Sequence, residues 1–377
     1  MRESIYDSDE VYKFLIARLK SPSASRSFLR ADVGFDAWAR QTRDLVRRLL
    51  LYAPERVPFE PRLLEELDFG SYTRRKISFH TAADCPVPAY LLIPKGIQRP
   101  APAVVALHDH SGRFYWGKEK IVDHRERLPL VDWFQGYRYG KRGFASALAE
   151  LGYVVIVIDA LGWGERGWLG ESWLREGSER LDNLEPGSEA YIREYDRIWS
   201  ERGFAKMVET VMYAGATYMG IMTWDDIRSV DFLCSLPEVD PGRIGCMGLS
   251  YGGYRAVMLG ALDERIRCSC PVGFMARFSD MVPYTTAGIS GVIPGLFDEL
   301  PFPDLASLAC PRPMFALSCL NDKLFDQSSS EKAVETIRSV YRKAGAEGAF
   351  RSKGYPVGHQ FDRSMQEEAF QWLREVL

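Results

Sequence analysis

The chain of 377 residues lacks several features that would place it in particular protein classes. It has no apolar run of 18 residues, the length that a membrane-spanning helix needs, and its N-terminus has no apolar core typical of a signal peptide. The sequence therefore favours a cytoplasmic protein. Internal repeats and low-complexity tracts are also missing, which excludes solenoids and β-propellers. A net charge of −3 indicates neither nucleic acid nor an anionic membrane as a partner.

The cysteine pattern argues against a disulfide framework. The seven cysteines are an odd number and lie mostly in apolar stretches, which predicts reduced thiols in the core. Cys268 and Cys270 stand too close together for a standard zinc knuckle and have no partner pair. The sequence predicts no metal site.

The most informative stretch is Arg243–Arg255, which predicts a strand, a sharp turn and a helix. Ser250 stands at the apex of the turn, with Gly248 and Gly252 two residues before and after it. Small neighbours allow the strand and the helix to pack closely around a strained residue. We therefore predict that Ser250 is a nucleophile. The N–H of Tyr251 is expected to face an oxyanion that develops at the site.

From residue 100 onward, predicted strands alternate with helices, as in an α/β fold with a mostly parallel central sheet and helices on both faces. Such sheets bind ligands at the carboxyl ends of their strands. Polar residues follow four of these strands: His108, Asp159, Ser250 and Asp322. They are expected to share one edge of the sheet.

Residues 1–72 are predicted to form a helical extension, and residues 73–377 the catalytic domain with an insertion at about 165–217. The extension carries no residue suited to chemistry, so it is expected to pack on the main domain or at a subunit contact. A lid over the site is the alternative. The insertion and the loop at 273–303 are expected to form the substrate pockets.

A serine hydroxyl needs an adjacent base to become a good nucleophile. His359 is the favoured base because it lies in a glycine-rich loop before the final helix, which produces the chain order Ser, Asp, His. Asp322 is the predicted carboxylate partner, and Asp326 is its rival. Asp159 precedes the serine turn and is expected to hold the loop that follows it by hydrogen bonds.

The loop after the strand that ends at residue 107 is expected to supply the second oxyanion donor, and the N–H of His110 is favoured. The side chains of His108 and His110 either brace this loop or contact the substrate. Asp109 and Trp163 are further candidates for substrate contact, since each lies just past the end of a strand.

These motifs resemble those of the α/β-hydrolase superfamily. The segment 226–253, with Pro237-Glu-Val-Asp-Pro-Gly and Gly248-Leu-Ser-Tyr-Gly-Gly, is similar to the dienelactone hydrolase and acetyl xylan esterase-like group and to the catalytic domain of prolyl oligopeptidases. The resemblance covers roughly residues 75–377 and implies a triad of Ser250, Asp322 and His359. Dienelactone hydrolases use cysteine at the turn, so the serine here implies ordinary ester hydrolysis. The family's His-Gly turn corresponds to His108-Asp109, where aspartate replaces glycine.

The sequence therefore predicts a serine hydrolase that cleaves a carboxylic ester through an acyl-enzyme, with no metal or organic cofactor. The expected substrate is a small ester, and the sequence does not separate an acetylated carbohydrate from a lipophilic ester. The sequence leaves the oligomeric state open, and a homo-oligomer is one of the states that it allows. A peptidase or amidase of the prolyl oligopeptidase-like group is one alternative, disfavoured because no propeller repeat is present. A non-catalytic binding protein is the other, disfavoured because all three triad positions are filled.

Overall fold

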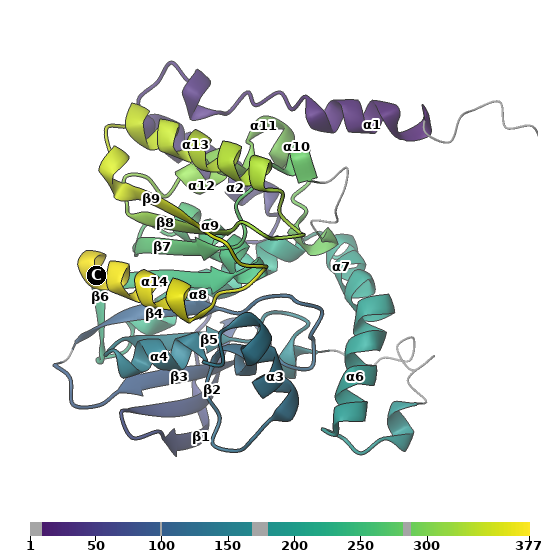
Figure 1. The fold of residues 1–377 in the computed structure, drawn as a ribbon, viewed down its shortest axis with the longest axis vertical. Helices are drawn as coiled ribbons and strands as arrows, with labels where there is room; N and C mark the ends of the chain where they lie inside the picture. The colour runs from purple at the N-terminus through teal and green to yellow at the C-terminus, as the bar shows by residue number, and fades with distance from the viewer. Residues whose placement is uncertain (1–9, 99, 168–179, 282–287) are drawn as a thin grey trace, which may run out of the picture.

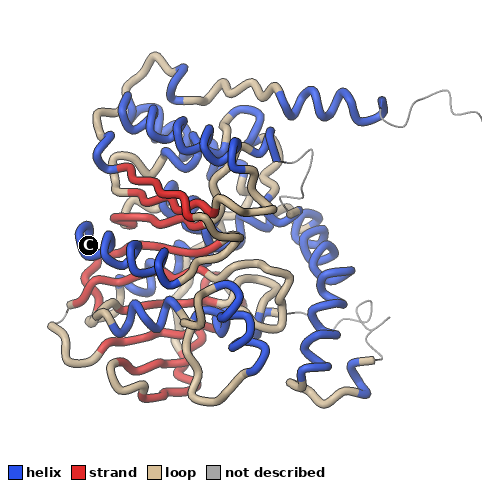
Figure 2. Tube along the Cα trace, in the orientation of Figure 1, coloured by secondary structure: helices blue, strands red, loops and turns tan. Residues whose placement is uncertain are grey.

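A computed structural model describes residues 10–98, 100–167, 180–281 and 288–377. Its centre is a nine-stranded sheet in the order β1-β2-β3-β5-β4-β6-β7-β8-β9, shown as arrows in Figure 1 and in red in Figure 2. The strands are β1 Arg62–Asp68, β2 Tyr72–Ala82, β3 Cys85–Pro94, β4 Ala101–Leu107, β5 Val154–Ile158, β6 Val239–Leu249, β7 Ile266–Val272, β8 Met314–Cys319 and β9 Phe350–Tyr355. The strands from β1 through β3 to β5 pair antiparallel, and those from β5 to β9 pair parallel.

Helices cover both faces of this sheet (Figure 1). The helices are α1 Glu10–Lys20, α2 Phe35–Leu49, α3 Pro129–Arg138, α4 Phe144–Glu150, α6 Glu189–Ile198, α7 Phe204–Tyr213, α8 Tyr218–Cys234, α9 Tyr251–Leu262, α10 Phe278–Met281, α11 Leu296–Glu299, α12 Phe302–Ser307, α13 Gln327–Lys343 and α14 Arg363–Val376. Apolar residues of α4 and α14 pack on one face, and those of α8, α9 and α13 pack on the other. This confirms the predicted α/β architecture.

The central strands are buried on both faces because helices cover them from both sides. Every residue of β5 is buried, and so is every residue of β6 from Ile244 to Leu249. These are the continuous apolar runs typical of parallel strands. The parallel register brings the carboxyl ends of β4, β6, β7, β8 and β9 to one edge of the sheet, where the polar residues that follow them gather.

The prediction of a wholly helical N-terminal extension was wrong in its last part. Helices α1 and α2 lie near the predicted positions, but residues 62–68 form β1, an edge strand paired with β2. The segment reads as helical because it is rich in Leu and Glu and has no β-branched residue. Pairing with β2 makes it a strand, while Leu63 and Leu64 stay exposed.

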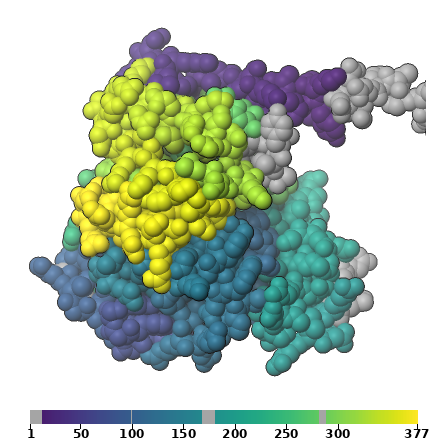
Figure 3. All heavy atoms as spheres, viewed as in Figure 1, coloured from purple at the N-terminus to yellow at the C-terminus, as the bar shows by residue number. Residues whose placement is uncertain are grey.

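The N-terminal segment after α1 packs on the C-terminal half of the chain, and Figure 3 shows it in purple against the yellow-green surface. Ser27 donates a hydrogen bond to the Asp304 carboxylate at 2.7 Å, and the Lys343 ammonium donates to the carbonyl of Phe28 at 2.7 Å. Through these contacts the N-terminal extension packs on the main domain.

All seven cysteines are free thiols, as the sequence predicts. A search of the described residues finds no helix with both the length and the apolar character that crossing a membrane requires.

Candidate active site

Ser250 lies at the turn between β6 and α9, with φ 58° and ψ −121°. Few residues other than glycine adopt this conformation, which is typical of a nucleophile held at a strained strand-to-helix turn. The turn is packed too tightly for side chains. A Cβ atom at Gly248 would lie 2.4 Å from the Leu107 carbonyl oxygen, and one at Gly252 would lie 2.1 Å from it. The predicted need for small residues at these two positions is therefore confirmed.

Replacing Gly252 by alanine should lower the free energy of unfolding by about 3 kcal/mol, because overpacking of a rigid site typically costs about 1–3 kcal/mol and here every near atom is backbone. Urea denaturation would measure the loss. Gly348→Ala is the matched control, since a Cβ at Gly348 meets no atom within 4 Å. The control should change stability by less than about 0.5 kcal/mol. Equal stabilities of the two variants would contradict the tight packing of the turn.

His359 and Asp322 form a close pair at the carboxyl ends of β9 and β8. The Nδ1 atom of His359 lies 2.6 Å from Oδ2 of Asp322, and both side chains are buried. The other oxygen, Oδ1, accepts the N–H of Leu324 at 2.8 Å, which holds the carboxylate in place. The Nε2 atom of His359 is buried and has no hydrogen-bond partner among the described residues. This nitrogen is free to exchange a proton with a reacting group.

Short contacts connect this pair with Ser250. The N–H of Ser250 donates to the Val272 carbonyl at the end of β7 at 2.8 Å. Gly273 follows Val272, and a Cβ atom on it would lie 3.4 Å from Cε1 of His359. The Phe325 ring stacks on the histidine ring, with ring centroids 5.8 Å apart. The ring of His359 therefore packs on Phe325 and lies close to Gly273, next to the serine turn.

Asp326, the alternative carboxylate partner for His359, caps a helix instead. Its side chain accepts the N–H of Ser329 at 2.9 Å and caps the N-terminus of α13. Helix caps commonly use aspartate in this way. The structure brings Asp322, and not Asp326, to His359.

Two backbone donors near the serine turn are free. The N–H groups of Tyr251 and His110 make no hydrogen bond to any residue in the described parts of the chain. Tyr251 is the first residue of α9, where an N–H has no partner within the helix. The two residues are neighbours, since their rings lie 6.1 Å apart. An oxyanion site requires free N–H groups of this kind, here one in the loop after β4 and one directly after the turn that follows β6.

Residues 117–288 match the acetyl xylan esterase (AXE1) family. Over 295 residues the chain is 25% identical to "Putative hydrolase YtaP" of Bacillus subtilis (strain 168), covering 77% of this chain and 83% of that protein. Its fold is similar to that of a "putative acetyl xylan esterase" from Bacteroides fragilis, with a TM-score of 0.72 and 17% identity over 100% of this chain and 97% of the other. The glucuronoyl esterase from Solibacter usitatus has a TM-score of 0.59 and 14% identity, covering 94% of this chain and 97% of that chain. The chain therefore has an α/β-hydrolase fold.

The match of this α/β-hydrolase with an esterase family also confirms the predicted enzyme class, a carboxylic ester hydrolase.

The three side chains predicted to contact the substrate, His108, Asp109 and Trp163, are buried, with exposed fractions of 1%, 0% and 0%. Their contact with a substrate stays a prediction. His108 bridges two strand ends, since its Nε2 accepts the N–H of Ala160 at 3.1 Å. Asp109 accepts the hydroxyl of Tyr139. The Trp163 indole donates to the carbonyl of His110 at 3.4 Å, so all three side chains support the loop that carries His110.

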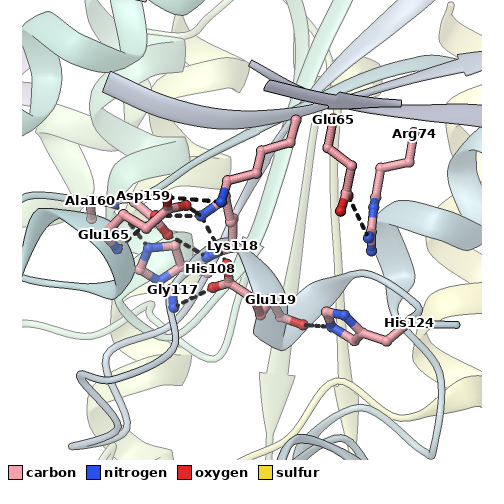
Figure 4. Close-up of polar contacts among 11 residues, drawn as sticks. Glu65, Arg74, His108, Gly117, Lys118, Glu119, His124, Asp159, Ala160 and Glu165 are labelled. Carbon is pink, nitrogen blue, oxygen red and sulfur yellow. Dashed lines mark hydrogen bonds and ion pairs between the residues drawn. The ribbon is translucent and has the colours of Figure 1, made fainter. Parts of the chain in front are cut away.

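Asp159 holds the following loop, as predicted, and is part of a larger buried cluster. Its carboxylate accepts the N–H of Glu165 at 3.1 Å and the ammonium of Lys118 at 2.7 Å (Figure 4). Glu165 and Glu119 lie 2.6 and 2.8 Å from the same ammonium. Burial raises the pKa of Asp159 to about 6, against the opposing effect of Lys118. The three carboxylates are close enough together to bind a cation, and the Lys118 ammonium already lies among them.

The insertion packs on the loop that carries His110. Asp196 of α6 accepts the N–H groups of Phe114 and Tyr115 at 2.7 and 2.9 Å, and Phe204 of α7 lies 5.0 Å from the His110 ring. Two of the tryptophans of the insertion, Trp168 and Trp173, lie outside the described residues. The pocket-forming role of the insertion stays a prediction.

Proposed function

We propose that this hydrolase cleaves carboxylic esters through an acyl-enzyme formed on Ser250, with His359 as the base and Asp322 as its partner. The observation that carries the proposal is the buried His359–Asp322 pair beside a strained serine turn. A carboxylate that accepts the proton on Nδ1 leaves the lone pair of Nε2 free. The Nε2 atom can then take the proton of the serine hydroxyl.

The reaction follows from this arrangement. Ser250 attacks the acyl carbon as its proton passes to Nε2 of His359, and the carbonyl oxygen becomes an oxyanion. The N–H groups of Tyr251 and His110 donate to that oxyanion. The charged imidazole, stabilised by Asp322, then protonates the leaving alcohol. In the second half, His359 activates a water molecule that cleaves the acyl-enzyme and releases the acid.

A small acyl group such as acetyl is the proposed specificity, with an acetylated carbohydrate as the substrate class. The match with the acetyl xylan esterase family and the structural likeness to a putative acetyl xylan esterase and a glucuronoyl esterase support this proposal. Tightly packed aromatic rings beside the base support a narrow acyl site as well. Phe274 lies 5.0 Å from Phe325, which itself stacks on His359.

Hydrolysis of p-nitrophenyl acetate, p-nitrophenyl butyrate and acetylated xylo-oligosaccharides tests the proposal. We expect acetate to be cleaved faster than butyrate, and the matching acetanilide to be cleaved far more slowly than the ester. A fluorophosphonate probe should label the protein once, and mass spectrometry of the digest should place the label on Ser250. Absence of labelling in folded protein would favour a non-catalytic binding protein, and preference for the anilide would favour an amidase.

A further inference from the structure

We propose that Lys120 is a positioning residue for the oxyanion site. Its buried ammonium holds the Asp109 carbonyl and thereby aims and polarises the N–H of His110. The inference rests on the proposed function, because it concerns the donor that would stabilise the oxyanion of that reaction.

The contacts of the Asp109 carbonyl are specific. The Lys120 ammonium, 1% exposed, donates to this oxygen at 2.7 Å and lies 3.4 Å from the carbonyl oxygen of His110. The Nδ1 atom of His108 lies 3.0 Å from the same Asp109 oxygen. Because Nε2 of His108 accepts the N–H of Ala160, the proton of this neutral imidazole is on Nδ1, which donates to Asp109. Two donors therefore occupy both lone pairs of one carbonyl.

The geometry of the peptide bond carries this restraint to the oxyanion site. The C=O of Asp109 and the N–H of His110 belong to one planar trans peptide, so they point in opposite directions. Holding the oxygen toward Lys120 and His108 turns the N–H away from both of them. That N–H is without a partner among the described residues, while the ring of the same histidine lies beside Tyr251. The other oxyanion donor belongs to Tyr251.

The charge of Lys120 adds to the restraint. A positive charge on the carbonyl oxygen draws electron density through the amide and makes its N–H a stronger donor. The charge is also buried, and electrostatic effects are larger in the protein interior than in water. Burial lowers the pKa of Lys120, and the Asp109 carboxylate, 3.8 Å away, counters this effect. Burial of Asp109 raises the pKa of its carboxyl, but the same ammonium together with hydrogen bonds from Ser111 and Tyr139 keeps that pKa below its ordinary value.

Lys118, two residues before Lys120, offers a matched control. Its side chain is 0% exposed, and its ammonium contacts the carboxylates of Asp159, Glu165 and Glu119. Unlike Lys120, it donates to no carbonyl of the loop that carries His110. Loss of either lysine leaves buried carboxylates unpaired. Only the loss of Lys120 releases the Asp109 carbonyl.

The experiment compares Lys120→Met with Lys118→Met in the full-length protein. The readouts are kcat and KM for p-nitrophenyl acetate and the Ki of a trifluoromethyl ketone, which forms an oxyanion adduct with a serine nucleophile. Removal of one oxyanion donor costs about 10²–10³-fold in kcat, so a weakened donor should cost about 10- to 100-fold. We expect this loss in Lys120→Met, with a parallel rise in Ki and a nearly constant KM. Lys118→Met should lose less than about threefold.

Equal losses in the two variants, or a loss in kcat without a rise in Ki, would overturn the role of Lys120. If Lys120→Met does not fold, the double variant Asp109→Asn/Lys120→Met removes both buried charges together and is compared with Asp109→Asn alone. The same 10- to 100-fold difference in kcat and Ki is expected between these two. Failure of the proposed function itself has a different signature, because wild-type protein would then show no activity that depends on Ser250.

Discussion

Replacing Ser250 by alanine should lower kcat for p-nitrophenyl acetate by about 10³-fold or more, because loss of a triad nucleophile removes the covalent route. The variant should remain folded, since alanine is smaller than serine and the serine side chain makes no hydrogen bond to a described residue. Initial rates at saturating substrate, with circular dichroism to verify folding, would measure the effect.

Ser290→Ala is the matched control for that substitution. Ser290 lies close to the turn, where its carbonyl accepts the hydroxyl of Tyr251 at 3.3 Å, and alanine keeps this carbonyl. The Ser290 hydroxyl is buried without a partner among the described residues, so its removal costs little. The control should retain wild-type activity. Equal rates for wild type and Ser250→Ala would show that the nucleophile lies elsewhere.

Replacing Asp322 by asparagine should lower kcat by about 10⁴-fold, with little change in KM. An asparagine amide can donate to Nδ1 of His359, which favours the tautomer with its proton on Nε2. That nitrogen could then no longer accept the serine proton. Steady-state kinetics with p-nitrophenyl acetate would measure the loss, and the size of asparagine should keep the local packing intact.

Asp326→Asn tests the rival carboxylate by the same change of charge. Asparagine caps helices about as well as aspartate does, so α13 should keep its N-terminus and the enzyme its activity. If the Asp326 variant lost activity while the Asp322 variant kept it, the partner of His359 in the reaction would have to be Asp326.

Local sequence patterns predicted most of the fold, because the preference of a segment for a helix, strand or turn depends on residues close together in the chain. The apolar run before Ser250 and the glycines around it predicted the strand, the turn and the helix, and the structure has all three. The edge strand β1 was missed for the same reason. Its local pattern favours a helix, and only pairing with a distant strand overrides that pattern.

The charged loop between β4 and α3 was the least predictable part of the site. In the sequence, Lys118 and Lys120 belong to a polar stretch of the kind that usually lies in solvent. In the structure both are buried, and each lies beside a carboxylate that follows a strand: Asp159 after β5 and Asp109 after β4. The sequence around Lys118 and Lys120 does not indicate which carboxylate each lysine contacts in the folded protein.

The sequence by itself determined the class of the protein, the strained serine turn and the order in which Ser250, Asp322 and His359 follow one another, since each depends on short-range periodicity, glycine placement and chain order. Only the tertiary structure decided which carboxylate meets His359, a contact between residues 37 positions apart. It also decided the orientation of the peptide between Asp109 and His110. Both depend on the register of parallel strands and on buried charges from separate segments, which come together only when the sheet has formed.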